Sequence, residues 1–421
     1  MKKMKIVLPI LCLLLGLTAC SSNKEQSKNE QNVSIDNSTN KKENVDLIVW
    51  CEEDAAEITN TMCESFKEHY KNDVNINITI EPHSEADMKN DILANVNANF
   101  DVFSFPDDQF DGLNAAGVLD VIPNSKEIKD RTLENAAVCA EYEGNMYAYP
   151  YTADNGYFLY YNKKYFKDED LKTLDGILKV CNDNNKKMQM NMSSGWYMYS
   201  FYGQTGLEFG INPSGLNNHC NWNTKKGDIT GLDVAKSIEA FIKNDAFIDC
   251  EDGDLINGFK NDTIIAGVCG TWVSSKIESI LKENYGAIKL PTYTCNGKKI
   301  QMATFLGYKM FGVNHYSNNK EWAHKLADWL TNEDNQLLRL QERNQGPANI
   351  NASNSKLVSQ NLAIKAILDE SQYGTIQRVG NKYWNACTNF ITELGTKEYN
   401  DTTLQNLIDK LVDEIEAPVG A

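Results

Sequence analysis

The chain has 421 residues, and its 41 basic and 58 acidic side chains give a formal net charge of −17 at pH 7. A surface this acidic repels phosphate backbones and anionic headgroups, which argues against nucleic-acid binding and against membrane docking by charge alone. The length suffices for two lobes with well-buried cores, and aromatic residues are abundant, with 7 Trp and 19 Tyr.

The first 45 residues are typical of an exported, lipid-anchored protein. Three lysines within the first five residues precede an apolar run over 6–17. This run of about 12 residues is shorter than the roughly 20 that span a bilayer, and it fits a signal peptide. The segment LTAC, ending at Cys20, resembles a bacterial lipobox. We therefore expect a lipoprotein signal peptide over 1–19, an acylated Cys20, a disordered tether over 20–45, and a location on the extracellular face of the cytoplasmic membrane.

The cysteines and histidines show no metal-ligand spacing. Beyond the tether, cysteines occur at positions 51, 63, 139, 181, 220, 250, 269, 295 and 387. Their number is odd and no two form a CxxC pair, which excludes a complete disulfide framework. The five histidines are scattered, without an HxxxH pair. We expect no metal site, and the thiols are either buried or kept reduced by a low-oxygen habitat.

Strands and helices alternate from residue 46 to 110. The apolar patterns predict strands over 46–50, 74–80 and 101–105, and helices over 55–70 and 86–98. This order indicates a parallel sheet with right-handed crossovers. Ligands of such sheets lie beyond the carboxyl ends of the strands, which places residues 52–54 and 105–109 near a possible site.

The segment 144–166 has a polar gap between two apolar strands. The alternating Tyr147 and Tyr149 predict a strand that Pro150 ends, and the continuous run from Tyr157 to Tyr161 predicts a strand buried on both faces. The polar stretch between them is either a tight loop within one core or a crossing between two domains.

The remaining elements follow from the same patterns. We expect strands over 188–192, 286–290 and 304–313, of which the last two return the chain to the first domain. Helices are predicted over 168–184, 195–205, 231–243, 320–331, 357–368, 381–394 and 403–416. The helix over 195–205 is rich in aromatic residues.

Several short motifs resemble the maltose-binding-protein family, the carbohydrate-binding extracellular solute-binding proteins of ABC importers. They are AYP at 148–150, YYNK at 160–163, the Gly-x-Trp of Gly270 and Trp272 with Phe259, Ala266 and Gly267 before it, and KEWAHKLADWLT at 320–331. The resemblance implies an α/β, two-lobed periplasmic-binding-protein fold with discontinuous lobes and a hinge. The N-terminal lobe would hold 46–153 and about 300–336, and the C-terminal lobe 154–299 and about 337–421.

The same resemblance implies a function and partners. A sugar or oligosaccharide would bind between the lobes, and hinge closure would deliver it to an ABC permease. The protein would act as a monomer without a cofactor. A sugar cleft needs aromatic faces together with carboxylates and amides.

The family's motifs place candidate ligand-binding residues in both lobes. In the N-terminal lobe they are Asp54, with Glu52 and Glu53 as near alternatives, the stacking Phe105, Asp108, and Gln109, which replaces a basic residue common in maltose binders. At the hinge Asp154 and Asn155 share one place. In the C-terminal lobe the candidates are the aromatic residues Trp196, Trp272 and Trp384, while Ser194 stands where a carboxylate is expected.

Two other functions remain open from the sequence. An acidic, aromatic cleft also suits a polyamine, through carboxylate pairing and cation–π contacts. A surface glycoside hydrolase would need two carboxylates, such as Glu53 and Asp108, about 5 to 9.5 Å apart. The sequence contains no GxGxxG, GxxxxGK[ST] or GxSxG motif, so it gives no sign of a nucleotide cofactor or a nucleophile elbow.

Overall fold

The computed structural model describes residues 42–85, 87–96, 98–212, 217–380 and 382–418. The predicted signal peptide, Cys20 and most of the tether lie outside these residues. Within them, two mixed sheets have separate hydrophobic cores. None of the described helices is long and apolar enough to cross a bilayer.

The N-terminal sheet has the strand order β17-β16-β3-β1-β2, and β6 also pairs with β16. Strands β1, β2 and β3 are parallel, whereas β16 runs antiparallel to β3 and β6. The bounds are β1 Glu43–Glu52, β2 Val74–His83, β3 Val102–Pro106, β6 Ala148–Asn155, β16 Phe305–Val313 and β17 Thr375–Ile376. The helices of this part are α1 Ala56–Tyr70, α2 Met88–Ala94, α3 Phe110–Ala115, α4 Ser125–Asp130, α5 Glu134–Cys139, α11 Lys320–Leu330, α12 Glu333–Arg343 and α13 Ile350–Ser353.

The C-terminal sheet has the order β11-β8-β12-β7-β13, with β7 antiparallel to both of its neighbours. Its strands are β7 Phe158–Asn162, β8 Lys187–Gln189, β11 Phe247–Ile248, β12 Ile264–Cys269 and β13 Tyr285–Ile288. Short hairpins join β4 Glu141–Tyr142 to β5 Asn145–Met146, β9 Phe209–Ile211 to β10 Asn218–Cys220, and β14 Thr292–Cys295 to β15 Lys298–Gln301. The helices are α6 Leu174–Asp183, α7 Gly195–Met198, α8 Gly231–Ile242, α9 Asp252–Lys260, α10 Ser274–Leu281, α14 Lys356–Gln360, α15 Leu362–Ser371, α16 Lys382–Thr396 and α17 Asp401–Glu416.

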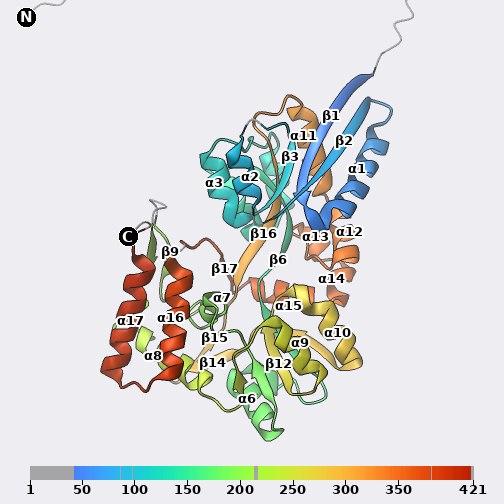
Figure 1. Cartoon of the computed structure of the whole chain (residues 1–421). Helices are drawn as coiled ribbons and strands as arrows, with labels where there is room; N and C mark the ends of the chain where they lie inside the picture. Colours follow the sequence, from blue (N-terminus) through green and yellow to red (C-terminus); the bar gives the residue numbers. More distant parts are fainter. Residues whose placement is uncertain (1–41, 86, 97, 213–216, 381, 419–421) are drawn as a thin grey trace, which may run out of the picture. The chain divides into compact units, whose positions relative to one another are not determined.

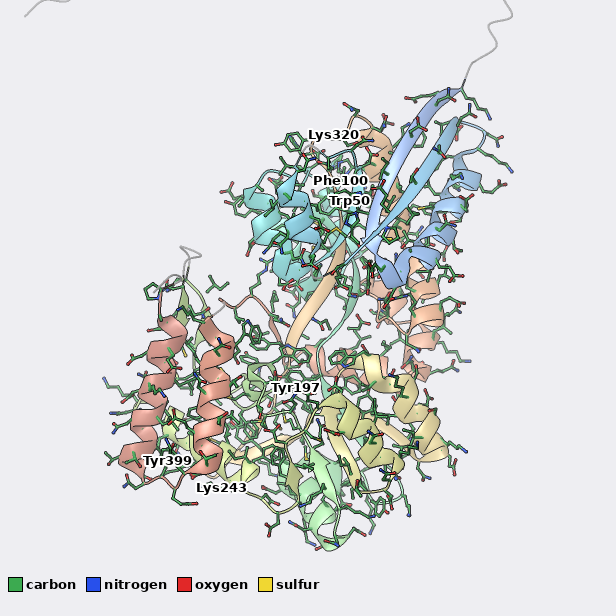
Figure 2. All side chains as sticks on the ribbon, in the orientation of Figure 1. Trp50, Phe100, Tyr197, Lys243, Lys320 and Tyr399 are labelled. Carbon is green, nitrogen blue, oxygen red and sulfur yellow. The ribbon has the colours of Figure 1, made fainter. Side chains whose placement is uncertain are left out.

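Helices and strands that are neighbours in each part pack against one another. In Figure 1, α1 lies beside β1 and β2, and α16 and α17 lie side by side. In Figure 2, Trp50 and Phe100 lie together in the N-terminal part, where their rings stack at 4.2 Å, while Tyr197 belongs to the C-terminal core. Strand β6 belongs to the N-terminal sheet and β7 to the C-terminal sheet, so the chain crosses between the two cores after Asn155. The prediction that Pro150 ends the first strand is wrong, because β6 continues through Pro150 to Asn155.

Most predicted elements occur, and several differ in length. The helix expected over 86–98 is confined to α2, because a turn at Asn95 ends it. The helix over 195–205 is only α7 followed by a 3-10 turn, and the helix over 357–368 is two helices separated at Asn361, which caps the second. Residues 43–45, assigned to the tether, already belong to β1.

The segment after residue 336 differs from the expected lobe assignment. Helix α12 contacts α1 and α11. The backbone N–H of Leu133 donates to Ala348 O at 2.8 Å, and that of Ile350 donates to Arg131 O at 2.8 Å. In this structure the chain therefore stays with the N-terminal sheet beyond the boundary expected near 337.

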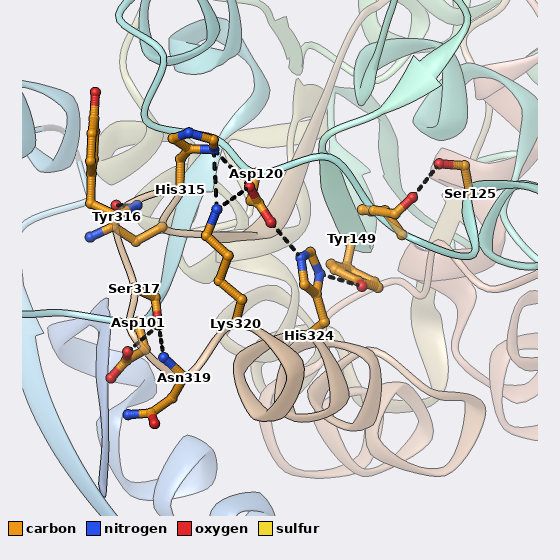
Figure 3. Close-up of polar contacts among 12 residues, drawn as sticks. Asp101, Asp120, Ser125, Tyr149, His315, Tyr316, Ser317, Asn319, Lys320 and His324 are labelled. Atoms are coloured by element: carbon orange, nitrogen blue, oxygen red, sulfur yellow. Dashed lines mark hydrogen bonds and ion pairs between the residues drawn. The ribbon is translucent and has the colours of Figure 1, made fainter. Parts of the chain in front are cut away.

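A polar cluster fastens the start of β6 to α11, as Figure 3 shows. His324 lies between the Tyr149 hydroxyl, 3.0 Å from Nδ1, and the Asp120 carboxylate, 3.1 Å from Nε2. Lys320 Nζ and His315 Nδ1 lie 2.8 and 2.7 Å from the other oxygen of Asp120. Burial alone would raise the pKa of Asp120, but the hydrogen bonds from Lys320, His324 and His315 lower it. The cluster satisfies its own polar groups, so we assign it a structural role.

Candidate functional site

A pocket of about 300 Å³ is lined by residues from both sheets and from the crossing between them. Its walls are formed by Glu52, Asp54, Asp154, Asn155, Thr271, Trp272, Lys309, Arg343, Asn344 and Gln345. The 3-10 turns that follow β1 and β12 supply Asp54 and Trp272, at the carboxyl ends of strands in each sheet. This is where a ligand is expected in sheets with parallel strands.

A larger hollow of about 530 Å³ lies along β1 and β2. Its lysines, Lys67 and Lys71, are paired with Glu64 and Glu68. No aromatic side chain is among the residues that line it. The smaller pocket is therefore the better candidate, because it combines an exposed indole with charged and amide groups.

Trp272 is the aromatic wall of the pocket. Its side chain is 48% exposed, which is unusual for a residue with so large an apolar surface. Its Nε1–H donates to Asp252 Oδ2 at 2.7 Å, and this bond to the first residue of α9 restrains the orientation of the ring. The ring centroid of Trp196 lies 5.7 Å away, with the two planes inclined by 32°. The two indoles are therefore neighbours, although Trp196 is not among the residues that line the pocket.

Trp196 is half-buried at the start of α7. Its ring packs edge-on against Tyr157, with centroids 4.8 Å apart, and its Nε1–H donates to Gln377 Oε1 at 2.9 Å. Ser194, where a carboxylate was expected, has another role here. Its hydroxyl accepts from Trp196 N at 3.4 Å and caps the helix.

Trp384 is half-buried on α16, against Tyr383 and Phe305, at centroid distances of 5.0 and 6.2 Å. It is not among the residues that line the pocket. Helix α16 contacts α7, so Trp384 lies on an element that supports Trp196.

Charged side chains form the opposite wall. Lys309 Nζ lies 3.1 Å from Glu52 and 2.6 Å from Glu85. Burial would lower the pKa of Lys309, but Tyr151, Glu85 and Glu52 together raise it, so the ammonium stays charged. Burial raises the pKa of Glu85, and Lys309 opposes that shift. Glu52 and Glu85 therefore share one cation, Lys309.

The crossing itself contributes Asp154 and Asn155. Asp154 is 7% exposed, and its Oδ2 accepts from Gly346 N at 2.9 Å. Burial raises the pKa of this carboxyl, although the bond from Gly346 lowers it in part. Asn155 pairs with Gly307 in the ladder of β6 and β16 and lines the pocket. Both residues share the predicted place at the hinge.

Asp54 lies in the turn after β1, where it is exposed and borders the pocket. Its backbone oxygen accepts a hydrogen bond from the Arg343 guanidinium. The end of α12 is thereby fixed to the turn that carries Asp54.

The structure places the other N-terminal candidates away from the pocket. Phe105 is 1% exposed and packs against Phe103 in the core, so neither face of its ring is open to a ligand in this structure. Gln109 is 6% exposed; its Oε1 accepts from Lys89 N and its Nε2 donates to Glu85 O, both at 2.9 Å. It fixes the backbone of Glu85, the partner of Lys309. Asp108 is exposed on the turn after β3 and is not among the lining residues.

Sequence reasoning missed five residues that line the pocket and one partner of a lining residue: Thr271, Lys309, Arg343, Asn344 and Gln345, and Glu85 beside Lys309. Only Lys309 left a signal in the sequence, since a lysine within the otherwise apolar strand FLGYKMFGV needs a buried partner. The described residues contain no group of three or more His, Cys, Asp or Glu side chains arranged to hold a metal.

The chain is similar in sequence and in structure to known proteins. A family model described as "Bacterial extracellular solute-binding protein" matches residues 61–366. The galactooligosaccharide-binding protein of Bacillus subtilis (strain 168) is 23% identical, over 88% of this chain and 86% of that protein. The maltodextrin-binding protein MdxE of the same organism is 25% identical, over 99% and 98%. The structure of a maltodextrin-binding protein of L. casei BL23 without ligand superposes with a TM-score of 0.77 at 22% identity, over 88% and 98% of the two chains. This similarity confirms the predicted two-lobed α/β fold.

Proposed function

The chain belongs to the bacterial extracellular solute-binding proteins, and on that basis we propose that it binds a sugar or oligosaccharide between its lobes. The observation that carries the proposal is the exposed Trp272 indole beside Trp196, opposite a wall of charged and amide groups. A sugar ring offers apolar C–H faces to such an indole and hydroxyls to such a wall. The names of the two relatives from Bacillus subtilis, a galactooligosaccharide binder and a maltodextrin binder, support the same ligand class.

The charged wall favours a neutral ligand over a polyamine. Glu52 and Glu85 are both paired with Lys309, so a cationic ligand would have to displace this lysine or share its carboxylates. Hydroxyl groups can instead bond to charged groups that remain paired. Asp54 and Asn155 have the chemistry to bind such hydroxyls.

A binding role is also better supported than catalysis. Glu53 and Asp108, the carboxylates considered for glycoside hydrolysis, are both exposed, and neither is among the residues that line the pocket. We propose that closure of the lobes on the sugar delivers it to an ABC permease, that the protein acts as a monomer without a cofactor, and that an acylated Cys20 anchors it to the extracellular face of the membrane.

A tryptophan-fluorescence titration tests the ligand class. The chain from residue 42 is titrated with maltotetraose, a galactooligosaccharide, monosaccharides and spermidine. A saturable change with one of the sugars is expected, because Trp272 and Trp196 would both lose contact with water. A response to spermidine that no sugar produces would replace the sugar by a polyamine. Incorporation of labelled palmitate into the full chain, and its loss in Cys20→Ala, tests the anchor.

A further inference from the structure

The chain after β17 contacts both lobes and reaches Trp196, the indole beside the pocket residue Trp272. Thr375 and Ile376 pair in parallel with Phe305 and Leu306 of β16. The N–H of Gln377 then donates to Leu306 O at 2.8 Å, and the N–H of Arg378 donates back to Ile376 O at 2.8 Å. This bond closes a tight turn around Gln377 and sets the direction of its side chain.

The side chain of Gln377 meets the ring of Trp196. Its Oε1 accepts the Trp196 Nε1–H at 2.9 Å. An indole N–H has no other bonding capacity, so this bond fixes the rotation of the ring about its side-chain torsions. Trp196 is the indole beside Trp272. Gln377 therefore orients the indole that packs beside the pocket residue Trp272.

Arg378 fastens the same turn to the N-terminal lobe. Its Nη2 donates to Cys139 O at the end of α5 at 2.6 Å, and its Nη1 lies 3.5 Å from the Asp111 carboxylate on α3. The guanidinium also lies over the ring of Phe110, 5.2 Å from its centroid. The guanidinium thus uses two of its N–H donors and its planar face at once, which a lysine could not do.

The far end of the segment is held by the C-terminal lobe. The N–H of Gly380 donates to Asn218 Oδ1 at 2.7 Å, and Asn218 is 1% exposed. The turn around Gln377 is thus held from both sides, by α3 and α5 through Arg378 and by the buried amide of Asn218.

We infer that Gln377 is a positioning residue for Trp196, and that Arg378 makes the orientation of this ring depend on contact with helices α3 and α5 of the opposite lobe. The expected effect on sugar binding rests on the proposed function. A ring held by both lobes presents its face to a sugar only when the lobes keep the relative position in which Arg378 contacts α3 and α5. The contact of Gln377 with Trp196 exists without any ligand.

The ligand-free protein gives the first test. The full chain has 7 tryptophans, and the indole N–H signal of Trp196 in an NMR spectrum is identified by its loss in Trp196→Phe. Gln377→Leu removes the acceptor and should move this signal to the position of an indole N–H without this hydrogen bond. Gln377→Glu keeps an acceptor oxygen, so its signal should remain that of a hydrogen-bonded indole. Arg378→Met should also move it, because the turn loses its anchor.

A matched control is a glutamine whose side chain contacts the chain just before β17. Gln204 is exposed, and its Nε2 donates to Tyr373 O at 2.8 Å without contacting Trp196. Gln204→Ala should leave the Trp196 signal in place. A Trp196 signal that Gln377→Leu does not move would overturn the positioning role, and one that Arg378→Met does not move would overturn its dependence on the opposite lobe.

Sugar binding gives the second test, with maltotetraose and a galactooligosaccharide as probes. Gln377→Leu should weaken the binding of whichever sugar responds by about threefold to tenfold, the effect of one hydrogen bond. In the Trp196→Phe background the same change should have no further effect. If no sugar binds the unaltered chain, the proposed function fails while the NMR test still decides the inference. Normal sugar binding with additive effects of the two changes would overturn the inference alone.

Discussion

The ring of Trp272 lies directly over the Cα of Gly270. A Cβ at residue 270 would fall 1.9 Å from Cζ3 and 2.1 Å from Cη2 of that ring. Only glycine leaves this space empty, which gives the Gly-x-Trp motif a physical reason. The glycine lets the indole fold back over its own chain and reach Asp252.

Gly270→Ala should therefore displace the Trp272 ring and weaken sugar binding. The ring is the far end of a side chain that is 48% exposed, so it can move outward at little cost to folding. We expect binding to weaken by about tenfold or more, with an almost unchanged urea midpoint. Gly210→Ala, at a glycine with open space around it, is the control. Equal affinity of both variants would show that the position of the ring does not matter.

Trp272→Ala removes the aromatic wall altogether. Truncation of a central aromatic contact usually costs about 2 to 4 kcal/mol of binding free energy. Calorimetric titration with the sugar that binds the unaltered chain measures this loss. Trp322→Ala is the comparison. This half-buried tryptophan of α11 packs against Tyr70 of α1 and against Lys325, and it is not among the pocket residues. An affinity unaffected by Trp272→Ala would remove this residue from the site.

Asp107 should make the stability of the N-terminal lobe fall with rising pH. It is 3% exposed, and burial raises its pKa from 3.8 to about 7, against the opposing effects of the Tyr308 N–H at 2.7 Å and of Arg378. The folded state thus binds a proton more tightly than the unfolded chain. Its contribution to stability is present below pH 4, is lost as pH rises to about 7, and changes little above that value.

Urea unfolding between pH 4 and 8 measures this effect. Asp107→Asn cannot ionise and keeps an acceptor for Tyr308. Relative to Asp107→Asn, the unaltered chain should lose up to about 4 kcal/mol of unfolding free energy across this range. Parallel profiles for Asp107→Asn and the unaltered chain would contradict the burial argument.

The nine cysteines of the described chain should behave as free, protected thiols. Eight of them are buried and Cys250 is partly exposed. Burial raises the pKa of Cys250 to about 11 and that of Cys181 to about 12, so thiolate is scarce at neutral pH. A thiol reagent added to the folded chain from residue 42 should modify Cys250 first and slowly. In denaturant without reductant all nine should react, and a smaller number would reveal a disulfide.

The sequence by itself determined many of the individual helices and strands, because the periodicity that predicts them is local. Periodic apolar residues predicted α1, α8 and α11 to within a residue or two, and the apolar run from Tyr157 to Tyr161 predicted β7. The strand before it was predicted to end at Pro150, whereas β6 continues to Asn155. Strand β12, Ile264–Cys269, was not predicted, and the Gly-x-Trp motif singled out Trp272 only through the family resemblance. Resemblance to a known family supplied the two-lobed arrangement.

Only the tertiary structure decided which side chains face the pocket. Strand β3 is buried on both faces from Val102 to Phe105, so alternation along it carries no information about where Phe105 points. The wall opposite Trp272 depends on the contacts of Lys309 with Glu52 and of Arg343 with the turn at Asp54, which join residues more than 250 positions apart. Such contacts depend on how the sheets and helices pack, and no local pattern of residues encodes them.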